Sequence, residues 1–168
     1  HVSFAYPEAG ENVLTDISFK AKKGQTIAVI GSTGSGKSTL INLIPRYYDV
    51  TKGSVKVDGV DVRDMTQKEL RDKLGYVPQK GVLFSGTIDS NIRYGKPEIT
   101  DAQVKEAAEV AQATEFIDTK PEKYESPVSQ GGTNVSGGQK QRLSIARAIA
   151  KDPEIFIFDD SFSALDFK

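Results

Sequence analysis

The segment GSTGSGKS, residues 31–38, constrains the fold of this chain more than any other stretch. It fits the pattern G-x-x-x-x-G-K-[ST], and it follows the β-branched apolar run TIAVI at 26–30. We expect residues 26–30 to form a buried strand, and the helix that opens at Lys37 to end or kink at Pro45. A strand, a glycine-rich loop and a helix in this order are typical of a loop that wraps around phosphate groups.

The residue types in this loop suit that chemistry. Gly34 and Gly36 let the backbone curl so that its N–H groups face an anion, and the helix that follows adds the positive end of its dipole. Lys37 can reach β- and γ-phosphates, the Ser38 hydroxyl suits Mg²⁺, and Thr39 can contact an α-phosphate. A plain glycine-rich turn with a solvated lysine is the less favoured reading. The predicted nucleotide-binding residues of the loop are Gly31, Ser32, Thr33, Gly34, Ser35, Gly36, Lys37, Ser38 and Thr39.

A second candidate element is the run EIFIFDD at 154–160. Its apolar part predicts a buried strand at residues 154–158, and Asp159 then stands at the strand end. Phosphate-loop enzymes hold Mg²⁺ through such an aspartate, often through water. The alternative is that Asp159 only caps the next turn. The phosphate loop upstream favours the metal role.

Composition excludes several other classes of protein. The chain has 168 residues, 38% of them hydrophobic and 27% charged, with a net charge of −1. This charge gives no basic field, so nucleic acid is not the expected partner. There is no cysteine, which excludes disulfides and thiolate metal sites. No apolar run reaches the roughly 20 residues that span a bilayer, and no secretory leader is present. Because the chain starts at His1 and stops at Lys168, we interpret it as a C-terminally truncated piece of a longer protein.

The remaining patterns predict an α/β fold. Apolar alternation or short β-branched runs predict further strands at residues 2–6, 13–21, 53–59 and 74–78. Residues 99–117 are helical in pattern, and Thr100 and Gln103 have the spacing of a capping box. A loop at 122–134 precedes a second long helix at 136–150. We expect one domain over residues 1–168, with an α/β core at 1–79 and 151–168 and a mostly helical insertion at 80–150.

The segment NVSGGQKQRLSIARAIAKDPEIFIFDD, residues 134–160, resembles the nucleotide-binding domain of ABC transporters. The family's signature Leu-Ser-Gly-Gly-Gln stands here as Val135 followed by Ser136, Gly137, Gly138 and Gln139. The resemblance covers essentially the whole chain, and residues 83–95 resemble the exporter version of the helical subdomain. It implies a phosphate-loop NTPase (RecA-like) core with an antiparallel β edge and an inserted helical subdomain.

The resemblance also implies roles for single residues. Gln79 in YVPQ is similar to the glutamine of the family's Q-loop, which contacts Mg²⁺ and takes part in catalysis. Tyr6 is similar to the aromatic residue that stacks on adenine, and Asp166 in SALD to the aspartate of the D-loop. By itself, Ser136 is also explained as an ordinary helix N-cap, and Tyr6 as a packing residue.

The family binds ATP and Mg²⁺ between two subunits, each ATP lying between one phosphate loop and the partner's signature. This implies a second nucleotide-binding domain and a transmembrane domain as partners, at the cytoplasmic face of the cell membrane. The family's switch histidine falls beyond Lys168, and Gln130 stands where exporters usually carry glutamate.

Asp160 departs from the family pattern, in which a glutamate acts as general base for the attacking water. Aspartate is shorter by one methylene, so we expect its carboxylate to sit about 1.5 Å further back. A displacement of about 1 Å can cost on the order of 10²-fold in rate. We therefore expect slow hydrolysis at this chain's own site, as in one half of a heterodimeric multidrug-type exporter. A homodimer with two slow sites is the alternative.

Three further function classes compete with an exporter motor. A soluble translation-type ATPase of the same superfamily would favour basic surfaces, which the net charge of −1 does not support. A chromosome or repair ATPase needs a long coiled coil between phosphate loop and signature, but Lys37 and Ser136 are 99 positions apart with no heptad run. A non-hydrolytic nucleotide sensor remains open because of Asp160.

Overall fold

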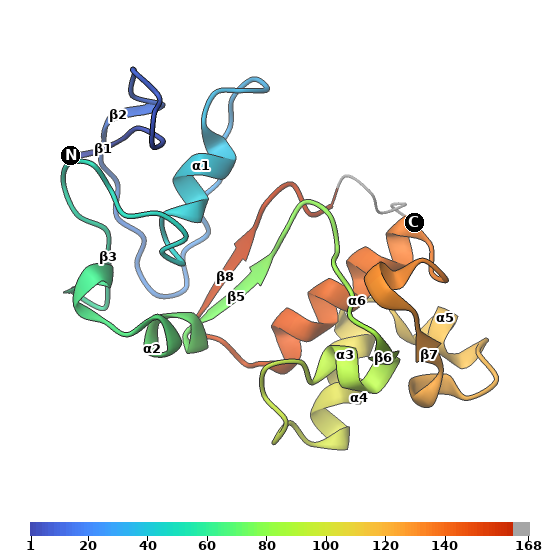
Figure 1. The fold of residues 1–168 in the computed structure, drawn as a ribbon. Coiled ribbons are helices and arrows are strands. Elements are labelled where there is room, and N and C mark those ends of the chain that lie inside the picture. Colours follow the sequence, from blue (N-terminus) through green and yellow to red (C-terminus); the bar gives the residue numbers. More distant parts are fainter. Residues whose placement is uncertain (163–168) are drawn as a thin grey trace. The chain divides into compact units, whose positions relative to one another are not determined.

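The computed structural model describes residues 1–162 of the chain. The chain divides into two compact units, His1–Asp72 and Lys73–Lys168, and each is described by itself. The phosphate loop belongs to the first unit. The two adjacent aspartates and the signature segment belong to the second (Figure 1).

The N-terminal unit is built on two short antiparallel ribbons. Strands β1 (Val2–Phe4) and β2 (Leu14–Ile17) pair with Val2 opposite Ile17, and their inward side chains join Leu43 in a small core. Strands β3 (Lys56–Val57) and β4 (Val60–Asp61) form a tight hairpin. Its turn residues Asp58 and Gly59 both have positive φ, 51° and 82°, as a two-residue Asp-Gly hairpin turn requires. The expected strands at 2–6, 13–21 and 53–59 are confirmed in shortened form.

Helices complete this unit. Helix α1 (Lys37–Asn42) begins at the phosphate loop, and Pro45 follows its C-cap Leu43 by two positions, as expected for a helix stop. A 3-10 turn, η1 (Val62–Asp64), leads to α2 (Gln67–Asp72).

The strand expected at residues 26–30 is not formed. Ile27 and Ile30 are 47% and 93% exposed, whereas a buried strand would cover both side chains. An apolar run becomes a strand only where a neighbouring edge can accept its backbone hydrogen bonds. One edge of β1 pairs with β2, and the other edge forms a bridge between Ser3 and Lys52. Residues 26–30 therefore cannot pair with β1.

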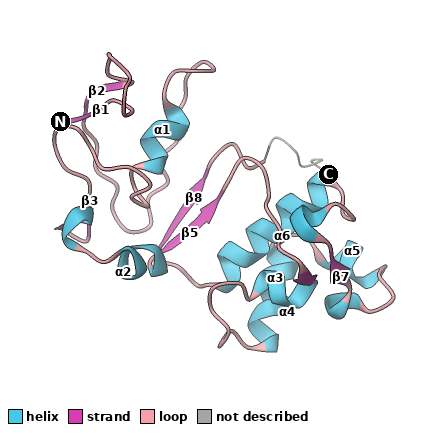
Figure 2. Ribbon diagram, in the orientation of Figure 1, coloured by secondary structure: helices cyan, strands magenta, loops and turns pink. Residues whose placement is uncertain are grey.

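The C-terminal unit joins a parallel strand pair to a group of helices (Figure 2). Strands β5 (Leu74–Val77) and β8 (Ile155–Phe158) run parallel, with Leu74 opposite Ile155 and Val77 opposite Phe158. The strand expected at 74–78 is therefore confirmed. The elements between them are β6 (Gly86–Thr87), α3 (Ile88–Ile92), α4 (Asp101–Val110), α5 (Thr114–Asp118), η2 (Lys123–Glu125), β7 (Pro127–Val128), η3 (Gln130–Gly132) and α6 (Gly137–Ala150).

Helix α6 is the centre of this unit. Helices α3 and α4 and strand β5 all contact it, and Leu143 and Ala146 on α6 are fully buried. Capping boxes open α4 and α6: Thr100 pairs with Gln103, as expected, and Ser136 pairs with Gln139. The helical pattern at 99–117 forms two helices rather than one, because Gln112 takes a left-handed conformation with φ 55° after α4.

Strand β8 forms where expected but is not buried on both faces. Ile157 is buried, whereas Phe156 and Phe158 are 44% and 39% exposed and stack on each other with centroids 6.0 Å apart. The run of apolar residues predicted burial, but a strand places successive side chains on opposite faces. Among the described residues, none of the helices is both long and apolar enough to span a bilayer.

Candidate nucleotide and signature sites

The phosphate loop has the backbone shape that anion binding needs. Gly34 and Gly36 take φ values of 80° and 89°, a region that favours glycine. Gly36 is the N-cap of α1 and makes no side-chain cap, so no N-cap side chain occupies the first-turn N–H groups. Ser35 N–H donates to the Ser32 carbonyl at 3.2 Å and tightens the loop. This shape fits an anion placed at the start of α1.

Lys37 closes the loop upon itself. Its Nζ donates to the carbonyl oxygens of Gly31 at 2.8 Å and Ser32 at 2.7 Å. Its ammonium is thus held over the mouth of the loop, where phosphate oxygens can replace the two carbonyls as acceptors. Ser38, the next residue, is exposed.

Tyr6 lies against the same helix. Its hydroxyl and the buried Thr39 hydroxyl are hydrogen-bonded at 2.9 Å. Its ring meets Phe4 and Tyr48 edge-on, with centroids 4.9 and 5.2 Å away. The structure therefore places Tyr6 and Thr39 together at the first turns of α1. The sequence reasoning missed Tyr48, which carries no motif and joins the cluster only through the fold.

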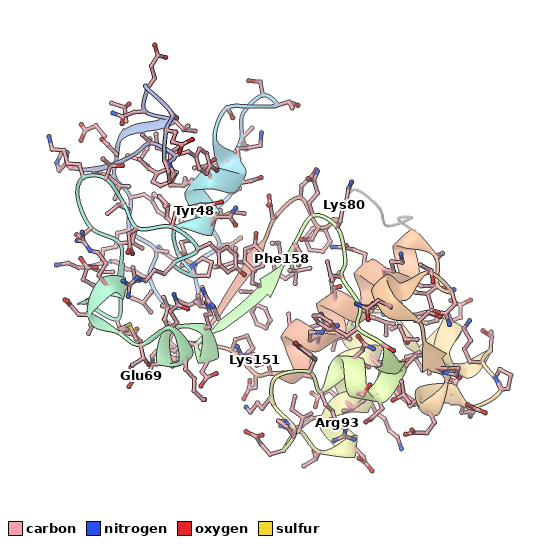
Figure 3. The ribbon with its side chains drawn as sticks, in the orientation of Figure 1. Tyr48, Glu69, Lys80, Arg93, Lys151 and Phe158 are labelled. Atoms are coloured by element: carbon pink, nitrogen blue, oxygen red, sulfur yellow. The ribbon has the colours of Figure 1, made fainter. Side chains whose placement is uncertain are left out.

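Gln79 and Asp160 meet in the C-terminal unit. The Gln79 amide donates from Nε2 to Asp160 Oδ2 at 3.2 Å, although 81 positions separate the two residues. The parallel register of β5 and β8 explains this, since both residues follow strands that end side by side. Figure 3 labels the neighbours of this pair, Lys80 in the loop that leaves β5 and Phe158 at the end of β8. With Nε2 engaged, Oε1 is the atom of Gln79 left for a metal ion.

The turn that carries the two aspartates is fixed by backbone contacts to β5. Asp159 N–H donates to the Val77 carbonyl at 3.0 Å and extends the strand pairing by one residue. Ser161, which is 1% exposed, donates from Oγ to the same carbonyl at 2.7 Å. Asp160 lies between them with φ 45° and is exposed. The anchor at Ser161 was missed from sequence, because a serine in a polar loop carries no signal of burial.

The signature segment opens α6. Ser136 Oγ accepts from Gln139 N–H at 3.2 Å, and Gln139 Oε1 accepts from Ser136 N–H at 3.1 Å. Gly137 has open space where a Cβ would stand, and no acidic side chain lies in the first turn. The helix start is therefore accessible to an anion from outside the unit.

Not every expected residue can be placed in one site. Asp166 lies outside the described residues. The phosphate loop and Tyr6 are described in one unit, and Gln79, Asp159, Asp160 and the signature in the other. Within the described residues, no group of three or more His, Asp or Glu side chains is suited to hold a metal ion. The expected Mg²⁺ set is of another kind, since it combines a hydroxyl, an amide and one carboxylate.

These features are those of a nucleotide-binding protein: a phosphate loop, and a second helix start that has no acidic side chain in its first turn. The chain belongs to the ABC transporter family, whose model matches residues 14–163. The prediction of an ABC nucleotide-binding domain is thereby confirmed.

Similar proteins agree with this assignment. A Bacillus subtilis protein named "Putative multidrug export ATP-binding/permease protein YgaD" is 49% identical over all 168 residues, which make up 29% of its length. A Staphylococcus aureus protein of the same description is 48% identical over the same span, again 29% of its length. The solved structure of a bacterial Atm1-family ABC exporter with ATP bound superposes with a TM-score of 0.92 at 41% identity, covering 98% of this chain and 29% of that one. The chain thus spans less than a third of these relatives.

Proposed function

We propose that this chain is the ATP-binding and hydrolysing motor domain of a membrane exporter. One observation carries the proposal: the chain has two separate helix starts without acidic side chains in their first turns, at α1 after the phosphate loop and at the signature of α6, and each suits an anion. One nucleotide needs one phosphate loop, so the second element is left for a partner's nucleotide. The names of the similar proteins, which join an ATP-binding part to a permease, support the export role.

The residues present fit Mg²⁺-ATP. Bound Mg²⁺ would neutralise phosphate charge during transfer. Ser38, Gln79 and Asp159 would hold it, and each offers an oxygen atom. Lys37 would exchange its loop carbonyls for β- and γ-phosphate oxygens, and Tyr6 would stack on adenine. In this assignment, Gly31 to Thr39 bind the triphosphate, and Ser136 to Gln139, with Asp166, face the partner's nucleotide.

Asp160 would act as general base on the attacking water, from a position further back than glutamate reaches. Its hydrogen bond from Gln79 orients the carboxylate. We therefore propose a slow site on this chain's own phosphate loop.

The proposed assembly is a dimer with a second ABC nucleotide-binding domain, favoured as a heterodimer in which the partner's site is the fast one. A transmembrane domain, on this chain or the partner, would place the motor at the cytoplasmic face of the membrane. The comparisons do not favour a translation-type ATPase.

The test is steady-state ATPase activity of the full-length transporter, alone and with its candidate partner. We expect Mg²⁺-dependent turnover with the partner and little without it. Lys37→Met removes the phosphate contact and serves as the binding-deficient control. ATP binding without turnover in every combination would leave a nucleotide sensor as the function and overturn the motor.

A further inference from the structure

Helix α6 holds the segment around Gln79, residues 78–84. Gln141, 1% exposed, donates from Nε2 to the Pro78 carbonyl at 3.1 Å. One turn further along, Ser144 lies under Gly81, and Arg147 follows another turn on. Positions 141, 144 and 147 are three apart, so each side chain neighbours the next along the helix surface.

The segment approaches the helix backbone closely at Gly81. A Cβ built on this residue would lie 2.7 Å from the Lys140 carbonyl oxygen and 2.8 Å from Ser144 Oγ. Real Cβ atoms do not come this close to backbone, so only glycine allows the approach. The loop after Gln79 therefore rests directly on the helix that the signature opens.

Arg147 makes the most extensive contacts of the three. Its guanidinium donates from Nη1 to the Val82 carbonyl at 2.9 Å, and from Nε and Nη2 to the Asn91 carbonyl at 2.8 Å and the Asn91 side-chain oxygen at 2.9 Å. It also lies 5.4 Å from the ring centroids of both Phe84 and Tyr94, which stack on each other 4.2 Å apart. Burial lowers the pKa of Arg147 from its usual value, yet a guanidinium remains charged at neutral pH.

Asn91 links Arg147 to the loop by hydrogen bonds. It is 1% exposed, and its side-chain oxygen accepts the Phe84 backbone N–H at 2.9 Å while also accepting Arg147. Its amide donates to the Phe84 carbonyl at 2.9 Å. Without Arg147, one of the two groups that orient this buried oxygen is lost.

We infer that Gln141 and Arg147 are positioning residues, which fix residues 78–84 to α6 and so tie the place of Gln79 to the helix that carries the signature. Both side chains donate to backbone carbonyls of the loop, so they set its path whatever its side chains are. A movement of the signature then moves the residue that contacts the nucleotide's metal. The inference rests on the proposed function, because it gives Gln79 its task there.

The test compares three substitutions on one helix in the full-length transporter assembled with its partner. Arg147→Met and Gln141→Met remove the donors and keep similar volume. Arg142→Met is the matched control, because Arg142 lies on α6 but donates to the Gln112 carbonyl at the end of α4, at 2.5 Å. We measure kcat, the KM for ATP and backbone hydrogen exchange over residues 79–84.

We expect Arg147→Met and Gln141→Met to lower kcat by about tenfold or more, since loss of positioning acts on the chemical step. The KM for ATP should stay within about twofold, because the phosphate loop is untouched. Exchange over 79–84 should speed up, at Phe84 N–H above all in Arg147→Met. Arg142→Met should change none of these, and Arg147→Lys should recover part of kcat by keeping one donor.

Equal kcat and equal exchange in all three variants overturn the inference. A parallel loss of ATP affinity, melting temperature and kcat in Arg147→Met and Gln141→Met overturns it too, since that is what loss of folding alone produces. Should Arg147→Met not fold, Gln141→Met and Arg147→Lys decide. An inactive wild-type assembly refutes the proposed function instead, and hydrogen exchange then still decides the positioning role.

Discussion

At the scale of single residues, the carboxylate of Asp160 reaches less far than that of a glutamate, because its side chain is one methylene shorter. It is exposed, it follows the strand end at Phe158, and its carboxylate accepts the Gln79 amide. The contact with Gln79 ties the proposed base to the proposed metal ligand. A longer side chain at 160 would keep the charge and extend the carboxylate by about 1.5 Å.

We expect Asp160→Glu to raise kcat for ATP hydrolysis at this chain's site by about tenfold, with on the order of 10²-fold as the upper limit. The reason is that a glutamate carboxylate reaches closer to the attacking water. The measurement is single-turnover hydrolysis by the full-length dimer whose partner site is disabled. Asp160→Asn is the control: it keeps an acceptor for Gln79 but no base, so its rate should fall below wild type. If neither substitution alters the rate, another residue is the base.

At Tyr6, two substitutions distinguish the role of the ring from the role of the hydroxyl. Tyr6→Ala should weaken ATP binding by about tenfold, because stacking on a base contributes about 1–3 kcal/mol. Tyr6→Phe keeps the ring and loses the contact with Thr39, so it should cost about 1 kcal/mol of stability and leave ATP affinity nearly unchanged. Equilibrium nucleotide binding and thermal melting distinguish the two. A Tyr6→Ala protein that melts lower yet binds ATP normally would make Tyr6 a packing residue only.

At the scale of elements, the capping boxes of α4 and α6 have the same geometry and different expected tasks. Thr100 and Ser136 each accept the N–H of the residue three positions on, at 3.3 and 3.2 Å. Thr100 opens a helix with no proposed role in nucleotide binding. It therefore serves as an internal reference for Ser136.

We expect Thr100→Ala and Ser136→Ala to destabilise the fold by similar amounts, about 1 kcal/mol each. Only Ser136→Ala should also reduce ATP turnover, at the partner's site, since its hydroxyl faces that nucleotide in the proposed dimer. Melting temperature and ATPase rate are measured on the same assembled preparations. Equal losses of activity in the two variants would reduce Ser136 to a helix cap.

Gly81→Ala tests how closely the loop packs on α6. The added methyl would stand 2.7 Å from the Lys140 carbonyl, so the loop must shift, at a cost of about 1–3 kcal/mol. Chemical denaturation measures this cost. Gly10→Ala is the matched control, because a Cβ there meets nothing within 4 Å. An unchanged unfolding free energy in Gly81→Ala would mean that the loop moves away from α6 without penalty.

Elements whose signals are local could be predicted from sequence. The structure has the expected capping box at Thr100, helix cap at Ser136, helix stop near Pro45 and left-handed glycines of the phosphate loop. Each of these depends only on neighbours a few positions away. The strand predicted at residues 26–30 was wrong, because a strand needs a partner edge and a local sequence pattern does not show whether one is present. The contacts from α6 to residues 78–91 could not be foreseen either, since Arg147 reads as an ordinary charge in a helix until the fold brings Asn91 to it.

At the scale of the whole molecule, three carboxylates of the N-terminal unit have a lowered pKa. Hydrogen bonds from Arg63 lower the pKa of Asp61 to about 2, and a hydrogen bond from Arg46 lowers the pKa of Asp49. The hydroxyl and backbone N–H of Thr66 lower the pKa of Glu69. Each of these carboxylates therefore binds a proton less readily in the folded unit than in the unfolded chain.

The stability that these carboxylates contribute to the N-terminal unit should therefore be complete above about pH 5 and decline as the pH falls toward 2, because the unfolded state takes up protons first. Asp61→Asn should flatten this dependence and lower stability at neutral pH, since it removes the charged partner of Arg63. Denaturant melts at several pH values measure both effects. The Asp64→Asn variant is the neighbouring control. A wild-type slope that persists unchanged in Asp61→Asn would assign the acid sensitivity to other groups.

The capping box at Ser136 limits which sequences evolution can accept at this position. For the helix alone, aspartate or asparagine would cap α6 as well as serine does. Serine differs because its oxygen accepts the Gln139 N–H while its proton remains for a second acceptor, such as a phosphate oxygen. Aspartate would preserve the fold and, in the proposed dimer, repel the partner's nucleotide. If the proposed dimer forms, selection for folding and selection for assembly act on the same oxygen atom, and a substitution that satisfies the first can be lost through the second.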